Sequence, residues 1–289
     1  HTICIGESKY KTHLIPSGVF FGIKSIIGPD CVVNVESFFE ELKYLKENGV
    51  NTELIKISPK ANIVTDTHIR EDNDTLTKEL GTTARGIAPC YRDKYARIGK
   101  LANSIPSLRN YIWDEVLSGN ILCEGAQGFW LDINHGNYPY ITSSTTLPYG
   151  ACSLGFPPQK IRRIYGAAKI YDTRSGIDPD FPESLLDVAD FIKIGENGEE
   201  YGVTTGRKRK VNYLNLDKLI YAINISGTTN LIISKLDILE KSGIFKFIYE
   251  KNLKIFDTNK EMIDKISEIL IRQCSGIQKV VYSESAEYI

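Results

Sequence analysis

Residues 215–237, NLDKLIYAINISGTTNLIISKLD, combine the signals of a helix with those of a strand that follows it. Asn215 is suited to cap a helix, and Gly227 is the kind of residue that ends one in a left-handed conformation. The short apolar run Leu231–Ser234 is typical of a buried strand. A helix followed closely by a buried strand predicts an α/β protein with a parallel sheet.

Two further segments carry clear helix signals. Asn34 precedes a one-sided apolar stripe that ends near Gly49, which predicts an amphipathic helix. Thr258 and Glu261 have the spacing of a capping box ahead of the apolar residues of a last helix. Both helices need an apolar surface to pack against.

Two short apolar runs are predicted as further strands. They are Ile121–Cys123, which leads into Gly125, and Ile164–Tyr171, which ends at Asp172-Thr173-Arg174. Ligands of open α/β sheets bind beyond the carboxyl ends of the strands. We therefore expect the chemistry in the loops that follow these strands.

The composition of the chain excludes several classes of protein. It has 289 residues, with 35 basic and 36 acidic side chains and a net charge of −1, so a nucleic-acid partner is not expected. No apolar run reaches the roughly 18 residues that span a membrane. The six cysteines form no CxxC pair, which favours a reducing compartment. We expect one α/β domain over residues 1–289, in the cytoplasm and without a membrane partner.

The segment Gly202–Lys210, GVTTGRKRK, gathers two threonine hydroxyls and four cations. Guanidinium groups bind carboxylates and phosphates in a bidentate geometry, and hydroxyls donate to the remaining oxygens. A basic turn exposed to solvent, or a nucleic-acid patch, would have a similar composition. Because the net charge is close to zero, we favour a loop that binds a small anion.

The segment Ser234–Asp237, SKLD, follows the predicted strand of the opening segment. The Asp237 carboxylate is able to accept hydrogen bonds from N1–H and the exocyclic amine of guanine, while the Lys235 stem lies along the ring. Adenine has no such donor pair. A surface salt bridge after a strand explains the same four residues equally well, so both interpretations stay open here.

Several glycine-bearing segments are suited to hold phosphate or a base. Gly81–Gly86 and Tyr91–Arg97 combine backbone donors, hydroxyls and arginines, although no GxxxxGK(S/T) phosphate loop occurs in the sequence. Glu124–Gly128 and Tyr138–Ser144 offer an amide and hydroxyls, but either segment is also compatible with a tight turn. His1, His13, His68 and His135 show no metal-ligand spacing, so we predict no structural metal.

Seven motifs follow one another along the chain: His1-Thr2, HLIPSG at 13–18, GTTARG at 81–86, EGAQG at 124–128, HGNYPYITSS at 135–144, VTTGRKRK at 203–210 and SKLD at 234–237. In this order they resemble the adenylosuccinate synthetase family. The resemblance covers the chain to about residue 240 and weakens beyond it. It implies a GTPase-like, mostly parallel sheet flanked by helices, with long functional loops.

The resemblance also implies an activity. Members of this family join L-aspartate to the 6-position of IMP at the expense of GTP, with Mg²⁺ as cofactor. The purine 6-oxygen is phosphorylated first, and the aspartate amine then displaces the phosphate. The chain would thus be a C–N ligase of purine biosynthesis. It would act as a homodimer, because Arg97 matches a residue that reaches into the neighbouring subunit's site.

The motifs assign residues to roles. By resemblance, His1 is the general acid that stabilises charge on the transferring phosphoryl group, and Gln127 is a second catalytic residue. The substrate-binding residues are Thr83, Arg97, Gln127 and Thr142 for the nucleoside monophosphate, Thr204, Thr205 and Arg207 for L-aspartate, and His13, Arg209, Lys235 and Asp237 for GTP.

The sequence departs from the family pattern in places. The family's phosphate loop, with the catalytic aspartate and lysine and the metal site, is expected upstream of His1. Ser175 replaces an apolar residue in the loop that contacts the ribose, and Ser283–Ile289 lacks the Gly-Pro-Asp-Arg that helps to enclose guanine. The preference for GTP therefore rests on Asp237.

Two alternatives follow from these departures. A phage branch of the compact members makes 2-aminoadenylosuccinate from dGMP, with ATP or GTP as donor, and the residue that decides lies upstream of His1. Asp237 argues modestly against an ATP donor. The second alternative belongs to another class of function: a protein that binds nucleotides without catalysing a reaction.

Overall fold

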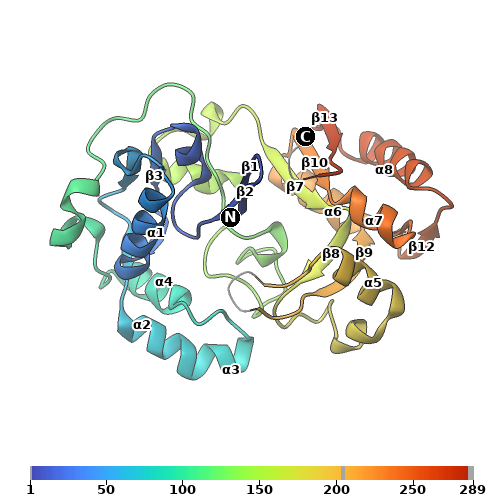
Figure 1. The fold of residues 1–289 in the computed structure, drawn as a ribbon, viewed down its shortest axis with the longest axis horizontal. Coiled ribbons are helices and arrows are strands. Elements are labelled where there is room, and N and C mark those ends of the chain that lie inside the picture. The colour runs from blue at the N-terminus through green and yellow to red at the C-terminus, as the bar shows by residue number, and fades with distance from the viewer. Residues whose placement is uncertain (1, 203–205, 286–289) are drawn as a thin grey trace. The chain divides into compact units, whose positions relative to one another are not determined.

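The computed structural model describes residues 2–202 and 206–285, and its elements confirm the α/β class (Figure 1). The chain divides into two compact units, His1–His135 with Ile141–Pro158, and Gly136–Tyr140 with Gln159–Ile289. The single domain over residues 1–289 stays a prediction.

The second unit contains the predicted parallel sheet. Its central strand, β10 (Asn230–Ser234), pairs in parallel with β7 (Tyr165–Lys169) on one side and β13 (Lys279–Tyr282) on the other. In the register of this sheet, Ser234 lies opposite Lys169. The carboxyl ends of β7 and β10 therefore share one edge.

The helix that precedes this strand is also confirmed. It is α6 (Leu216–Ser226), and the Asn215 side chain caps it by accepting a hydrogen bond from the N–H of Lys218 at 3.0 Å. Gly227 follows with a φ of 68°, the left-handed conformation that glycine adopts without strain. Residues 215–234 thus fold as their pattern predicts.

A mixed sheet completes the strands of this unit. Its order is β12-β11-β9-β8, formed by Asn252–Ile255, Lys246–Tyr249, Lys210–Asn215 and Tyr171–Arg174. The β9 and β11 pair is parallel, whereas β8 with β9 and β11 with β12 are antiparallel.

The predicted strand Ile164–Tyr171 is a pair of strands instead. β7 ends at Lys169, and β8 begins at Tyr171 in the other sheet, so residues 172–174 pair with β9 rather than forming a loop. Ile170 and Tyr171 are consecutive and both buried, which one strand with a single buried face does not allow. The chain passes between sheets at this point.

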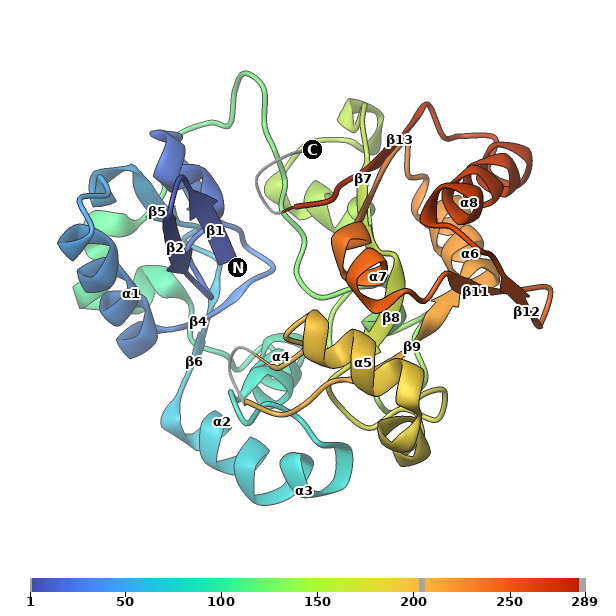
Figure 2. The ribbon, with the colours of Figure 1, turned by 45° about the vertical axis from the view of Figure 1, so that its right-hand side comes forward.

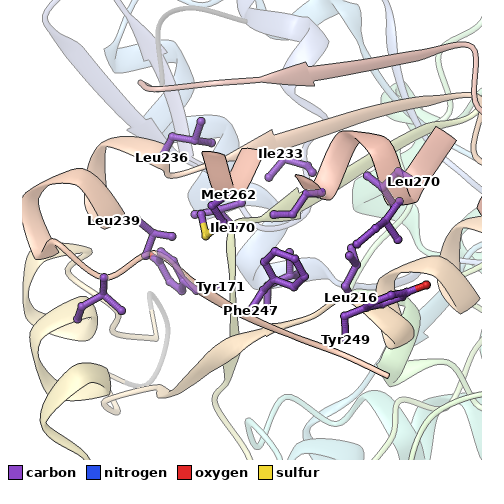
Figure 3. Packing of buried hydrophobic residues seen from close by; sticks show 14 of the residues in the cluster. Ile170, Tyr171, Leu216, Ile233, Leu236, Leu239, Phe247, Tyr249, Met262 and Leu270 are labelled. Atoms are coloured by element: carbon purple, nitrogen blue, oxygen red, sulfur yellow. The ribbon is translucent and has the colours of Figure 1, made fainter. Parts of the chain in front are cut away.

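The apolar side chains of the second unit form one core (Figure 3). Helices α5 (Ala189–Asn197), α7 (Leu236–Ser242) and α8 (Asn259–Gln273) contribute to it along with the strands. α5 lies against β9 and α7 (Figure 2). Thr258 caps α8 by accepting from the N–H of Glu261 at 3.2 Å, as the spacing of these two residues predicts.

The first unit is built from short strand pairs and helices. β3 (Ser25–Ile27) pairs in parallel with β5 (Ile55–Ile57), and β4 (Val32–Asn34) with β6 (Asn62–Val64). β1 (Thr2–Ile5) and β2 (Ser8–Lys11) form an antiparallel hairpin.

The helices of the first unit include the predicted one. α1 (Val35–Glu47) begins at Asn34, whose side chain accepts from the N–H of Ser37 at 2.8 Å. α2 (Asp66–Glu71) continues through a π-helical turn, Asp72–Leu76, into α3 (Thr77–Leu80), and α4 (Ile87–Ala96) follows.

The predicted strand Ile121–Cys123 is wrong. These residues form irregular chain, and Leu122 is 85% exposed. A strand needs a neighbour for its backbone N–H and C=O groups. Among the strands that the structure describes, none pairs with this segment.

In the part of the chain that the structure describes, no helix combines the length and the apolar character needed to cross a bilayer.

Candidate functional site

The glycine-rich loop Gly81–Gly86 is anchored by the carboxylate of Asp72, which is 2% exposed. One carboxylate oxygen accepts from Oγ1 of Thr82 at 2.5 Å, and the other accepts from the N–H of Gly86 at 2.8 Å. Gly86 has a φ of 71°, and a Cβ there would lie 2.8 Å from the backbone nitrogen of Ile69. Thr83 lies exposed between these anchors.

The stretch 91–97 forms most of α4 and its end, so its cations differ in surroundings. Arg92 pairs with Glu71, and Nζ of Lys94 lies 2.6 Å from the Asp30 carboxylate. Arg97 ends the helix in a left-handed conformation, with a φ of 64°, and its side chain is exposed. Arg97 is therefore the cation of this stretch that is best placed for an external ligand.

The predicted catalytic amide lies on exposed chain. Gln127 has a φ of 60°, which is uncommon for a residue other than glycine. Strained conformations of this kind gather at ligand-binding sites. Thr142 is half-buried, and its backbone N–H donates to the C=O of Leu131 at 2.8 Å.

A buried carboxylate holds the segment that contains Thr142. Asp132 is fully buried and accepts from the N–H of Asn134 at 2.8 Å, the N–H of Thr146 at 2.7 Å and Oγ1 of Thr145 at 3.0 Å. Burial opposes ionisation of Asp132, but these three hydrogen bonds outweigh it, so the pKa of the carboxyl lies below its usual range. Asp132 is thus a charged anchor.

His13 is positioned by Glu41 on α1. The two Glu41 carboxylate oxygens accept from the backbone N–H groups of His13 at 2.6 Å, Leu14 at 3.1 Å and Ile15 at 3.1 Å. The His13 ring Nδ1 lies 3.5 Å from the same carboxylate, and the ring is exposed. Glu41 thereby fixes the backbone from which His13 extends.

In the second unit, Lys235 and Asp237 lie just beyond the end of β10, where the opening segment predicts a ligand site. Lys235 has a φ of 72°, and its Nζ donates to the C=O of Gly198 at 3.3 Å. Asp237 lies half-buried in the first turn of α7. Lys169 ends β7 beside them, opposite Ser234.

Glu200 is the charged centre of this strand edge. Its carboxylate is 3% exposed and accepts from Lys169 at 2.7 Å, Tyr171 at 2.8 Å and Arg209 at 3.0 Å. Burial would raise the pKa of Glu200, but its bonds with Lys169 and Tyr171 and the charge of Arg209 lower it. Glu200 is therefore ionised in the folded protein.

The basic loop of the second unit is closed at its base. The N–H of Gly202 donates to the C=O of Arg207 at 2.8 Å, and Tyr201 and Lys208 form a backbone bridge. Arg207 and Lys208 are exposed, whereas Lys210 is buried and pairs with Glu183 at 2.9 Å. Two cations of this loop, Arg207 and Lys208, are therefore exposed. The other two, Arg209 and Lys210, pair with Glu200 and Glu183.

Some of the predicted site residues lie outside the described part of the chain. These are His1, Thr204 and Thr205. Among the described residues, no group of three or more His, Cys, Asp or Glu side chains is placed to hold a metal ion.

The structure gathers only part of the predicted set. In the second unit, Arg209 contacts Glu200, and Lys235 contacts Gly198 on the turn that carries Glu200, with Asp237 two residues after Lys235. In the first unit, Thr83, Arg97, Gln127 and Thr142 lie on separate segments. The sequence analysis missed the anchors Asp72, Asp132, Glu41, Lys169 and Glu200. The sequence places Glu200 two residues before the basic loop and Asp132 between the motifs at 124–128 and 135–144, which is the local signal that could have found them.

Comparison with known proteins gives a consistent result. The family model described as adenylosuccinate synthetase matches residues 1–110 and 100–248. An adenylosuccinate synthetase of Lysinibacillus sphaericus is 34% identical over 88% of this chain and 72% of its own length. That of Lactococcus lactis subsp. lactis is 36% identical over 83% of this chain and 68% of its own length.

Solved structures agree with the sequence relatives. A fully ligated adenylosuccinate synthetase from Plasmodium falciparum matches with a TM-score of 0.71 and 28% identity, over 91% of this chain and 76% of that one. The cyanophage S-2L succinoaminodeoxyadenylate synthetase, bound to dGMP and dATP, matches with a TM-score of 0.63 over 93% of this chain and 87% of that one. Its 17% identity shows a shared fold. On these matches, the chain belongs to the adenylosuccinate synthetase family and is a C–N ligase.

Proposed function

We propose that this ligase joins L-aspartate to C6 of IMP and consumes GTP. The observation that carries the choice of donor is the placement of Lys235 and Asp237 at the same strand edge as Arg209 and its anchor, Glu200. A half-buried carboxylate at this edge is able to accept both donors of a guanine edge. The lysine stem beside it covers the ring face.

The reaction proceeds in two balanced steps. A general base takes the N1 proton of IMP, the γ-phosphoryl group of GTP moves to the 6-oxygen, and GDP leaves. The amine of L-aspartate then attacks C6, the C6–O bond breaks, inorganic phosphate leaves, and the attacking nitrogen loses a proton. In the proposal His1 supplies a proton near the bridging oxygen, and the Gln127 amide holds the reacting group.

The remaining substrate contacts follow from the charges on the loops. Arg207, with Thr204 and Thr205, binds the carboxylates of L-aspartate, because the exposed guanidinium at the end of this loop suits a small dicarboxylate. Thr83 and Thr142 bind the nucleoside monophosphate. His13 and Arg209 lie toward GTP.

Arg97 is assigned across a homodimer interface in this proposal. Its exposed position at the end of α4 supports that role, together with the neighbouring Tyr95 and Ile98, which are 71% and 72% exposed. Exposed apolar side chains around a cation are the composition expected of an interface that presents the cation to a neighbour.

Magnesium belongs to the proposal as a partner of the donor phosphates. Mg²⁺ is held mainly by substrate phosphate oxygens and water, with few protein carboxylates. When bound, it neutralises charge on the phosphates during transfer. The proposal further places the protein in the cytoplasm, where these nucleotides are made.

A second substrate pair has an observation in its favour. Ser175 lies in the segment that contacts ribose by resemblance. Arg174, the last residue of β8, directly precedes it and is held by Asp178 at 3.3 Å and by the C=O of Tyr140 at 2.5 Å. An arginine engaged within its own unit is less available to the ribose. This favours a test of dGMP as acceptor, with ATP as well as GTP as donor.

The test of the base assignment is Asp237→Asn. An amide presents one acceptor and one donor where the carboxylate presents two acceptors, so the preference for GTP over ATP is expected to fall about tenfold or more. The kcat/KM values for the two donors measure it. A GTP to ATP ratio equal to that of the wild type would remove Asp237 from the base site.

A further inference from the structure

The turn Gly198–Glu200 joins the two ligand segments of the second unit. It follows α5 directly and leads into the basic loop that begins at Gly202. On one side, the Gly198 C=O accepts from Nζ of Lys235 at 3.3 Å. On the other side, the Glu200 carboxylate accepts from Arg209, and the Glu200 C=O accepts from the Arg209 N–H at 2.9 Å.

The turn is tied to the core through Tyr171. The Tyr171 side chain is 2% exposed and belongs to the apolar cluster (Figure 3). Its hydroxyl donates to Glu200 at 2.8 Å. A Cβ on Gly198 would lie 2.5 Å from that hydroxyl and 3.3 Å from Cγ of Glu200. Glycine at this position is therefore required for the tyrosine and the carboxylate to meet.

Charge adds to this geometry. Two cations, Lys169 and Arg209, contact the buried Glu200 carboxylate, and the charge of a third, Lys235, acts on Lys169. Lys169 also donates to Oγ1 of Thr173 at 3.0 Å. Without the Glu200 charge, these cations would repel one another at a half-buried site, and both Arg209 and Lys235 would move.

We propose that Glu200, on this turn, is a positioning residue that couples the aspartate loop to the guanine segment. Through Arg209 it sets the base of the loop that carries Arg207, and through the turn it sets Lys235. Binding of L-aspartate and binding of GTP thus depend on the same buried carboxylate. This inference rests on the proposed function of the two segments.

The experiment compares Glu200→Gln with Glu199→Gln in the full-length protein. Glu199 is the exposed neighbour, so the second variant makes the same chemical change without touching the buried contacts. We expect Glu200→Gln to raise the KM of both L-aspartate and GTP by about tenfold or more, the effect of one charge-assisted contact, while kcat falls less. Glu199→Gln is expected to keep both KM values.

Further variants separate positioning from a loss of folding. Tyr171→Phe removes one hydrogen bond to the carboxylate but keeps its charge, and we expect a lower melting temperature with nearly unchanged KM values. Glu200→Asp keeps the negative charge but shortens the side chain by one methylene, and it is expected to give KM values between those of the wild type and Glu200→Gln. If Glu200→Gln does not fold, the KM values of Glu200→Asp test the inference. Wild-type KM values in the folded Glu200 variants, or a fall in kcat alone, would overturn the inference. An inactive wild type would instead contradict the proposed function.

Discussion

Individual buried or half-buried carboxylates hold the ligand loops of this protein. Asp72, Asp132 and Glu41 each accept two or more hydrogen bonds from one loop. Glu200 instead accepts from side chains of β7, β8 and the basic loop. None of the four belongs to the residues assigned to substrates. A carboxylate has two oxygens and accepts from several donors, so it suits the crowded N–H groups of a tight loop. Such anchors keep a loop rigid while its outer side chains stay available.

The exposed arginine of the basic loop gives a prediction at this scale. We expect Arg207→Leu to raise the KM of L-aspartate by about tenfold or more, with a smaller effect on the nucleotides, because one charge-assisted contact to a carboxylate is lost. Steady-state kinetics with each substrate varied in turn measures it. Lys208→Leu, at the exposed neighbour, is the control. Equal losses for IMP and L-aspartate would contradict the assignment of Arg207.

Asp172 gives a prediction about pH. Burial raises the pKa of Asp172 to about 6, although its carboxylate accepts from the N–H of Asn215 at 3.0 Å. Between the ordinary carboxyl pKa, about 4, and this value, the folded protein binds more protons than the unfolded chain, so this residue lowers stability as pH rises.

The variant Asp172→Asn removes this titration and keeps an acceptor for Asn215. The free energy of unfolding of the variant minus that of the wild type is expected to grow by about 1 to 3 kcal/mol as the pH rises from about 4.5 to about 7. Urea unfolding at both pH values measures the change. Asp264→Asn, on the exposed side of α8, is expected to show no such trend. Parallel pH profiles of wild type and Asp172→Asn would contradict the prediction.

Elements of secondary structure differ in how far the sequence predicts them. α1, α6 and β10 follow their patterns because the caps, the apolar period and the closing glycine lie within each segment. The division between β7 and β8 and the irregular chain at 121–123 depend on which remote strand is available for pairing. No local spacing contains that information. The residues of the ligand loops were predicted in the same way, from motifs that lie within one segment.

The carboxylates that anchor these loops cannot be predicted from the sequence, for a related reason. Asp72 acts on Gly86, and Glu41 acts on His13. The partners are 14 and 28 residues apart. Many acidic residues of the chain lie 14 to 28 residues from a loop, so the sequence separation alone does not identify the carboxylate that holds it.

Gly86, in the loop between α3 and α4, is expected to tolerate no larger side chain. We expect Gly86→Ala to cost about 2 to 4 kcal/mol, because it combines a left-handed φ with a Cβ 2.8 Å from backbone. The control is Gly49→Ala, where φ is 76° and nothing lies within 4 Å of the added Cβ. That variant is expected to cost about 1 kcal/mol. Equal costs in urea unfolding would show that the close approach at Gly86 relaxes freely.

At the scale of the whole molecule, membership in the family establishes the type of reaction, and the substrates remain the proposal. In the proposal, the strand edge with Lys235 and Asp237 favours GTP, whereas Ser175 and the engaged Arg174 concern the sugar of the acceptor. Donor and acceptor choices are therefore separate questions. One experiment answers both.

That experiment crosses IMP or dGMP as acceptor with GTP or ATP as donor, in the presence of L-aspartate and Mg²⁺, using the full-length protein and chromatography of the products. The account predicts turnover of IMP with GTP, and formation of GDP, phosphate and the aspartate adduct in equal amounts. A preference for dGMP would contradict the proposed acceptor. Nucleotide binding without turnover in all four reactions would contradict the proposed ligase activity itself and favour a non-catalytic binding protein.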